Sequence, residues 1–225
     1  MSNTRKIIEV IVEFVLIIVS LLGMILSGMG SGFMGKGTGF LYFTIQSNIT
    51  ITCITIPYLI SNLLQLLGKK GFSNRIIDVL KYIFTVAITI TFLVYACALS
   101  PNMPLSYNLS FRNLSVHFIV PILALIDFFV FDNGIIVTKK NCLYGLAMPF
   151  YYVLFFLFGI PLNFRYLEGS KAPYFFLNYE RFGWFRIDSN GIGVVYWIII
   201  ATIFFIGLCY LFYVIQRALK KSKWK

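Results

Sequence analysis

Thr44 and the only histidine of the chain, His117, are the residues whose types and positions point most directly to chemistry. Each lies a few residues inside a long apolar segment, and the two segments are predicted to enter a membrane from the same side. Polar and ionisable groups are costly inside a bilayer and mark functional sites by default. A threonine hydroxyl becomes a nucleophile when a neighbouring base takes its proton, and histidine titrates near neutral pH. The pair could therefore carry out acyl transfer, with an ester formed on Thr44.

The composition determines which elements must position this pair. The chain has 225 residues, of which 59% are hydrophobic and 12% charged, and this excludes an ordinary soluble domain. A membrane-spanning helix needs roughly 20 apolar residues. Six such segments are predicted at about 7–28, 41–67, 76–99, 114–134, 143–162 and 194–215. We therefore predict an all-α integral membrane protein with six transmembrane helices in one bundle, formed by a single domain over residues 1–225.

The net charge of +11 could suggest nucleic-acid binding, but the positions of the basic residues indicate a membrane orientation instead. One side of the predicted bundle holds Arg5, Lys6, Lys69, Lys70, Arg75, Lys139, Lys140, Arg217, Lys220, Lys221, Lys223 and Lys225. The opposite side holds only Lys36, Arg112, Arg165, Lys171, Arg181 and Arg186. Because cytosolic segments of membrane proteins are enriched in Lys and Arg, both termini are predicted to be cytosolic. The basic C-terminal tail is expected to lie against anionic headgroups.

The predicted helix 41–67 carries one polar face. At 100° per residue its members fall within an arc of roughly 140°, and they are Thr44, Ser47, Asn48, Thr52 and Thr55. One polar face on an apolar membrane helix indicates a bundle interior or a wet cavity. For Thr52 and Thr55 we favour hydrogen bonding between helices, and for the three residues nearer the outer surface we favour function. Gln46 points away from this face and is expected to bond a neighbouring helix or loop.

His117 lies one turn inside the predicted helix 114–134. Pro121 has no N–H to satisfy the carbonyl of His117, so a local kink is expected there. Asn113 lies one turn before His117 on the same face. Asp127 lies deeper, rotated by about 80°, and is expected to pair with a polar group in another span or with Lys81. A purely structural hydrogen-bonding role for this lone histidine is an equally common arrangement.

In the catalytic interpretation, His117 is the base and Thr44 the nucleophile. No acidic residue obviously orients the imidazole, so a dyad is predicted rather than a triad. Candidates for binding the substrate or stabilising an oxyanion are Ser47, Asn48, Gln46 and Asn113. The chemistry requires no metal and no organic cofactor.

Three short motifs resemble a known family. The segment LYFTIQSN (41–48) resembles the helix-two motif of the androgen-induced type of integral membrane proteins and their microbial relatives. HFIVP (117–121) resembles their second motif, and PYFFL (173–177) is also similar to the family. The number and order of helices agree over nearly the whole chain. The resemblance implies a threonine hydrolase acting on fatty acid esters of hydroxy fatty acids, with Thr44 as nucleophile and His117 as base. A related group of membrane acyltransferases makes acyl transfer an alternative.

The connection 163–193 is long and rich in aromatic and basic residues. This combination favours the interface between headgroups and acyl chains. It is either an ordinary aromatic belt or a lid near the Thr44–His117 site, with a cation that meets a lipid carboxylate or phosphate. At the other side, Glu9 and Glu13 are expected to pair with a basic neighbour rather than act as a catalytic carboxylate pair.

Two further patterns are not expected to carry chemistry. The four cysteines form no CxxC and no metal-ligand spacing, so we predict buried, small apolar side chains and no structural zinc site. Gly30, Gly32 and Gly35 satisfy GxGxxG, but a membrane helix precedes them where a nucleotide-binding motif needs a strand.

The sequence thus predicts an intramembrane lipid-ester hydrolase whose partners are a lipid or fatty-acyl ester substrate and membrane lipids. One alternative is a small-molecule or ion transporter lined by the polar face of helix 41–67, which would need a continuous polar path to the cytosol. Others are a membrane acyltransferase and a non-catalytic lipid-binding or scaffold protein. The bias towards Ile, Phe, Lys and Asn favours a microbial source and hence a plasma membrane.

Overall fold

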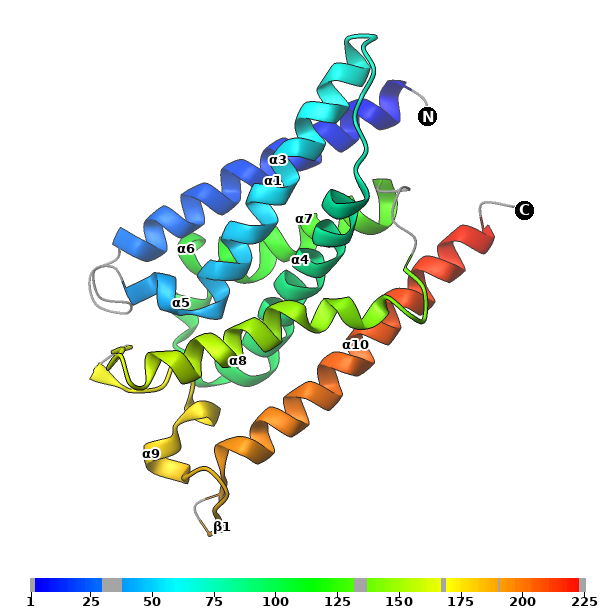
Figure 1. The fold of residues 1–225 in the computed structure, drawn as a ribbon. Helices are drawn as coiled ribbons and strands as arrows, with labels where there is room; N and C mark the ends of the chain where they lie inside the picture. The colour runs from blue at the N-terminus through cyan, green and yellow to red at the C-terminus, as the bar shows by residue number, and fades with distance from the viewer. Residues whose placement is uncertain (1–2, 30–37, 132–136, 167–168, 190, 223–225) are drawn as a thin grey trace.

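The computed structural model describes residues 3–29, 38–131, 137–166, 169–189 and 191–222 (Figure 1). Within these residues, six helices are long and apolar enough to cross a membrane. They span Asn3–Ser27, Phe43–Leu66, Arg75–Asn102, Phe111–Phe131, Cys142–Gly159 and Val194–Lys220. The predicted all-α membrane bundle is confirmed, and the protein is a multi-pass integral membrane protein. The glycine-rich stretch 30–37 lies outside the described residues.

The helices run in the predicted order, and several contain irregular turns. The long α-helices are α1 (Asn3–Met29), α3 (Phe43–Leu66), α4 (Arg75–Val94), α8 (Ala147–Gly159) and α10 (Val194–Ser222). A π-helix, Tyr95–Leu99, and a 3-10 turn, Ser100–Asn102, extend α4. The fourth span is built from α6 (Phe111–Leu114), a π-helix (Ser115–Ile119), α7 (Val120–Ile126) and a second π-helix (Asp127–Phe131). The short helix α5 (Leu105–Asn108) precedes it.

The connection 163–193 contains short elements of regular structure. A 3-10 turn, Phe175–Leu177, leads to α9 (Tyr179–Phe182). The two-residue strands β1 (Ile187–Asp188) and β2 (Gly191–Ile192) pair antiparallel, with Ile187 opposite Ile192 and Asp188 opposite Gly191. We call residues 163–193 the outer loop.

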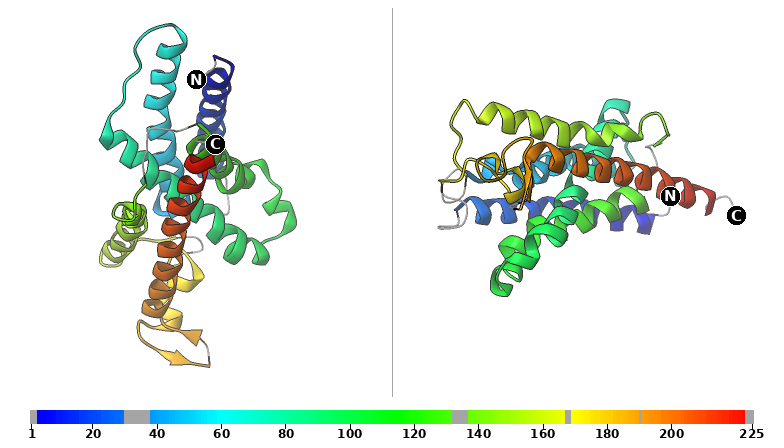
Figure 2. Two further views of the ribbon diagram at one scale, coloured as in Figure 1. Left: turned by 90° about the vertical axis from the view of Figure 1, so that its right-hand side faces the viewer. Right: turned by 90° about the horizontal axis from the view of Figure 1, so that it is seen from below.

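An inner group of four spans encloses the polar residues. Helices α1 and α3 lie side by side, and α4 and the α6–α7 span pack against them, whereas α8 and α10 lie on the other side of α4 (Figures 1 and 2). The start of α1 and the end of α10 lie at one end of the bundle, which we call the terminal end. The outer loop and the start of α3 lie at the opposite end, the loop end. Thr44 is therefore placed at the loop end and Lys81 towards the terminal end.

The inner group is layered by polarity. Six buried apolar side chains form a cluster that we call the middle layer: Leu16, Ile51, Ile54, Ile88, Val120 and Ala124. Towards the loop end, the same four spans bury Ser20, Asn48, Thr91 and His117. Towards the terminal end they bury Glu13, Asn62, Lys81 and Asp127. Apart from buried threonines at the level of the middle layer, such as Thr55 and Thr85, the polar residues therefore lie in two groups with apolar packing between them.

Large apolar side chains cover the outward faces of the spans. Examples are Ile11 and Phe14 of α1, Phe150 of α8, and Ile203 of α10. Such faces suit contact with acyl chains. Lipid tails are as apolar as these side chains, so burying the side chains inside the protein would give no gain in hydrophobic free energy. Two cysteines share this outward position: Cys53 and Cys97 are exposed, so their predicted burial was wrong, whereas Cys142 and Cys209 are buried as predicted. All four are free thiols.

The cytosolic placement of the terminal end is testable by cysteine labelling in whole cells. With the four native cysteines replaced, we expect Lys171→Cys in the outer loop to react with a membrane-impermeant maleimide. Lys69→Cys, in the exposed connection between α3 and α4, should react only after the cells are permeabilised. The basic residues near the terminal end would hold it on the cytosolic side. The reverse labelling pattern would contradict this orientation.

Candidate active site

Thr44 and His117 contact each other inside the loop end of the bundle. Thr44 lies in the first turn of α3, and His117 lies in the π-helix Ser115–Ile119. The Thr44 Oγ1 atom is 3.3 Å from the Nε2 atom of His117. The residues are only 6% and 4% exposed, respectively. The structure thus brings together the two residues that the sequence singled out, at one depth in the bundle.

The second ring nitrogen of His117 determines the direction of this hydrogen bond. The Nδ1 atom lies 3.2 Å from the backbone carbonyl oxygen of Asn113. A carbonyl can only accept, so Nδ1 carries the hydrogen in the neutral ring and Nε2 presents its lone pair. Nε2 therefore accepts from the Thr44 hydroxyl, which is the arrangement that a general base needs.

The helix around His117 is irregular where Pro121 predicts it to be. A kink was expected here, and the structure has a π-turn at Ser115–Ile119. A second π-turn, Tyr95–Leu99, faces it, and the Tyr95 ring stacks on the imidazole with a centroid distance of 3.8 Å and an interplanar angle of 25°. The Tyr95 hydroxyl donates to Asn108 Oδ1 at 2.6 Å. π-Turns inside helices are frequent at functional sites.

Asn48 connects the two halves of the site. Its Nδ2 donates to the carbonyl of Thr44 at 2.8 Å and to the carbonyl of Val116 at 3.1 Å. Val116 lies five residues before Pro121, which has no N–H to offer it in the π-register. A side-chain amide thus replaces the missing backbone donor. It holds the first turn of α3 against the π-turn Ser115–Ile119, which we call the histidine turn. We describe Asn48 as a positioning residue.

The other residues of the polar face bond between or within helices. Ser47 Oγ is 3.0 Å from the Thr44 carbonyl oxygen and 2.7 Å from Thr91 Oγ1 on α4. Thr52 Oγ1 donates to Ser20 Oγ on α1 at 2.7 Å. Thr55 bonds within its own helix, to the carbonyl of Ile51 at 2.8 Å. Helix-to-helix bonding, as we favoured for the deeper residues, therefore holds for Thr52 and not for Thr55.

The two remaining candidates are placed differently. Gln46 points away, as expected, and its Nε2 donates to the carbonyl of Phe40 at 3.0 Å. Asn113 is buried, its carbonyl orients His117, and its Nδ2 donates to the carbonyl of Asn108 at 3.2 Å. These amide groups already bind protein acceptors, so the geometry gives them positioning roles. Their contact with a substrate or oxyanion stays a prediction.

The outer loop places a tyrosine on Thr44. The Tyr174 hydroxyl lies close to the side chain and the backbone of Thr44 and to Tyr152. Tyr152 in turn donates to the carbonyl of Leu41 at 2.9 Å. Burial raises the pKa of the Tyr174 hydroxyl above its usual value of about 10. Tyr174 therefore remains a neutral hydrogen-bond donor over the physiological pH range.

The start of α3 also favours negative charge. The first N–H groups of a helix have no partner within the helix, and they lie at the positive end of its dipole. In α3 these amides belong to Phe43 and Thr44, since the bonds to the Tyr42 carbonyl begin with Ile45. The Tyr42 ring packs edge-on against Tyr166 and Tyr174, at centroid distances of 5.5 and 6.0 Å. Helix dipole and loop hydroxyl thus converge on Thr44.

Comparisons with models of protein families, with curated proteins and with solved structures found no match to this chain. The resemblance to androgen-induced-type membrane proteins therefore stays a prediction from the three motifs.

The positioning role of Asn48 predicts a loss of stability when its amide is removed. In Asn48→Ala, the buried Val116 carbonyl loses its side-chain donor, and an unsatisfied buried polar group costs about 1–3 kcal/mol. We expect a lower thermal unfolding temperature in detergent. Asn102→Ala is the matched control, because Asn102 is exposed and bonds only one carbonyl of its own span, at 3.3 Å. Equal unfolding temperatures for the two variants would contradict the role.

Proposed function

We propose that the protein is an intramembrane hydrolase of lipid esters, with Thr44 as nucleophile and His117 as its base. The proposal is carried by one observation: the Thr44 hydroxyl lies 3.3 Å from the imidazole nitrogen that is free to accept its proton. The carbonyl of Asn113 holds the other ring nitrogen, as an orienting group does in other nucleophile–base pairs.

The reaction proceeds in two acyl-transfer steps. His117 Nε2 takes the proton of Thr44 as Oγ1 attacks the ester carbonyl carbon. The tetrahedral intermediate collapses, the bond to the alcohol oxygen breaks, and His117 gives its proton to the leaving alcohol. Water then attacks the acyl-threonine ester while His117 takes its proton. Collapse releases the fatty acid and returns the proton to Thr44.

The oxyanion of each tetrahedral intermediate would be stabilised at the start of α3. The Tyr174 hydroxyl and the first amides of α3 already converge on Thr44. Donors that are fixed before the reaction stabilise developing charge without reorganisation. In this role Tyr174 is a catalytic residue, and the outer loop positions it.

A fatty-acyl ester with a free carboxylate suits the surroundings of the site. The spans present apolar faces to acyl chains, and the outer loop carries exposed Arg165 and Arg181 among its aromatic residues. A guanidinium favours a carboxylate or phosphate. Esters of hydroxy fatty acids combine these features, and we place the enzyme in the plasma membrane of a microbe. A membrane acyltransferase would use the same acyl-threonine with another acceptor in place of water.

A transporter is the other candidate function. The buried Lys81–Asp127 ion pair and the neighbouring Glu13 favour it, since ionisable residues inside a bundle often mark ion routes. The middle layer weighs against it, because six apolar side chains separate these groups from the polar residues of the loop end. We therefore prefer the hydrolase.

The nucleophile is testable by intact-protein mass spectrometry after treatment with a lipid-like fluorophosphonate. We expect one adduct on the wild-type protein and none on Thr44→Ala. His117→Ala should react at least roughly 10³-fold more slowly, because a hydroxyl without its base is a weak nucleophile. Thr50→Ala is the control and should react like wild type, since Thr50 lies on the same helix and bonds only within it, to Ser47.

Two results would contradict this assignment. One is an adduct that persists in folded Thr44→Ala, because the label would then lie on another residue. The other is a folded wild-type protein that forms no adduct and hydrolyses no fatty-acyl ester.

The oxyanion role of Tyr174 predicts a separate kinetic effect. Tyr174→Phe should lower kcat by about 10–10³-fold and leave KM nearly unchanged, as for other oxyanion donors. Because burial disfavours the phenolate and raises the pKa of Tyr174, the wild-type rate should show no loss from its ionisation up to about pH 10. Initial rates on a fatty-acyl ester across this pH range measure both effects. An unchanged kcat in Tyr174→Phe would assign the tyrosine a merely structural role.

A further inference from the structure

Three buried carboxyl groups meet at the terminal end of the bundle. Glu9 and Glu13 come from α1, and Asp127 is the first residue of the π-helix Asp127–Phe131. One oxygen atom from each residue lies within 4.8 Å of those of the other two. Glu9 is 5% exposed, Asp127 1% and Glu13 not at all. We call these three residues the carboxyl cluster.

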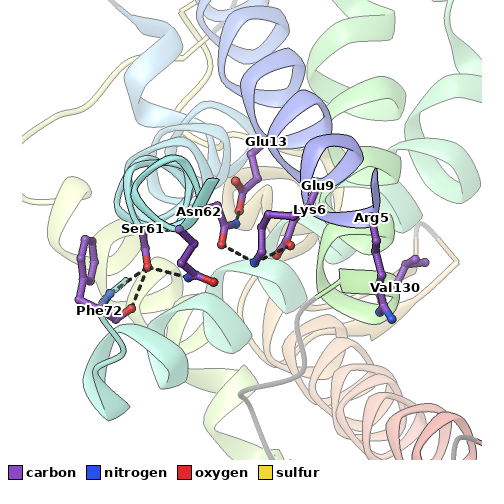
Figure 3. Close-up of polar contacts among 9 residues, drawn as sticks. Arg5, Lys6, Glu9, Glu13, Ser61, Asn62, Phe72 and Val130 are labelled. Carbon is purple, nitrogen blue, oxygen red and sulfur yellow. Dashed lines mark hydrogen bonds and ion pairs between the residues drawn. The ribbon is translucent and has the colours of Figure 1, made fainter. Parts of the chain in front are cut away.

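Two lysines neutralise part of this cluster. The ammonium group of Lys81 pairs with Asp127 and lies 4.3 Å from the centroid of the Tyr58 ring. Lys6 Nζ lies 3.0 Å from Glu9 Oε2 and donates to Asn62 Oδ1 at 2.9 Å (Figure 3). The expected pairings of Asp127 with Lys81 and of Glu9 with a basic neighbour are thus confirmed, whereas the same expectation was wrong for Glu13, which accepts from the amide of Asn62.

Glu13 forms no ion pair of its own among the described residues, because the nearby ammonium group of Lys81 pairs with Asp127. Asn62 Nδ2 donates to its Oε1 at 2.8 Å (Figure 3). Its second oxygen, Oε2, is buried and has no hydrogen-bond partner among the described residues. A buried carboxylate oxygen without a partner is expensive inside a membrane bundle. This oxygen is therefore available for a ligand.

The charges indicate what that ligand is. When ionised, the three carboxyl groups carry three negative charges, against which Lys81 and Lys6 supply two positive ones. Among these five groups one negative charge remains, and an uncompensated charge in a low-dielectric interior is strongly destabilising. A single positive charge would balance the cluster, whereas a divalent ion would leave an excess of one.

We propose that Glu9, Glu13 and Asp127 bind one monovalent cation of about the size of sodium. Carboxylate oxygens are hard ligands that favour hard cations. An ion such as calcium, which is close to sodium in radius, contacts its oxygens at about 2.3–2.6 Å. Such an ion can touch oxygens on its opposite sides that lie up to roughly 5 Å apart, and the separations within the carboxyl cluster do not exceed 4.8 Å.

A cavity gives this site a route to solvent. It measures about 290 Å³ and shares Glu9 with the carboxyl cluster and Asn62 with its surroundings. Its other walls include Ser73 and Asn74, which are exposed in the connection between α3 and α4. A hydrated ion could therefore enter from the terminal end and lose its water at Glu9.

The cation site is independent of the proposed hydrolase. The middle layer lies between the carboxyl cluster and the Thr44–His117 pair. The bound ion would connect the first half of α1 to the start of the π-helix Asp127–Phe131, and these are more than 100 residues apart in the sequence. Its effect should therefore be on stability, and it should be retained when Thr44 is replaced.

The test is the thermal unfolding temperature of the full-length protein in detergent, as NaCl replaces choline chloride at constant ionic strength. We expect a saturable rise of roughly 5 °C at 100 times the Kd. Binding of ²²Na⁺ should saturate at one ion per chain. Glu13→Gln should abolish both effects, and Thr44→Ala should keep both. Glu180→Gln is the matched control, since Glu180 lies in the outer loop, where Lys171 pairs with it.

Three results would overturn the proposal. An unfolding temperature independent of NaCl, with no ²²Na⁺ bound to folded wild-type protein, would mean that a proton balances Glu13. Stabilisation by MgCl₂ or CaCl₂ but not by NaCl would contradict the monovalent charge. Normal ²²Na⁺ binding by Glu13→Gln would place the ion elsewhere. If Glu13→Gln does not fold, Glu13→Asp keeps the charge and should weaken ²²Na⁺ binding at least tenfold, and unchanged affinity would count against the site.

Discussion

Polar groups inside this bundle have no bulk water to bind, so each must find its partner on a neighbouring span. The histidine turn depends on this constraint most directly. Pro121 leaves the Val116 carbonyl without a backbone donor in the π-register, and Asn48 of α3 supplies a donor from its side chain. The same amide group binds the carbonyl of Thr44. The Asn48 amide thus supplies the hydrogen bond that the Val116 carbonyl lacks, and it also sets the separation between Thr44 and His117.

The sequence predicted those features that the membrane itself dictates. Span length follows from bilayer thickness, so the six apolar segments and their order could be predicted to within a few residues. Depth follows from position along a span, which is why Thr44 and His117 could be expected at one level. The polar face of α3 followed from helical periodicity, and its five members are buried. Each of these inferences needs only one helix and the bilayer.

Features that require two or more packed helices could not be predicted in this way. Tyr95 reaches His117 only because a π-turn rotates its ring onto the imidazole. Tyr174 reaches Thr44 because the outer loop folds back over α3, although PYFFL had marked its segment. The carboxyl cluster joins residues at opposite ends of the inner group's sequence, so spacing gave no sign of it. Cys53 and Cys97 lie on lipid-facing surfaces, where an apolar side chain need not be buried.

The layering of the inner group bears on how its polar face should be interpreted. Seen on α3 alone, that face resembles the lining of a route across the membrane. In the bundle, the hydroxyls of Thr55, Thr85 and Thr89 donate to carbonyls of their own helices, so they form no bridge past the middle layer. A hydroxyl satisfied in this way behaves towards its neighbours much like an apolar group. The polar residues then act as two local assemblies, one suited to activating a hydroxyl and the other to neutralising charge, and tight apolar packing keeps them apart.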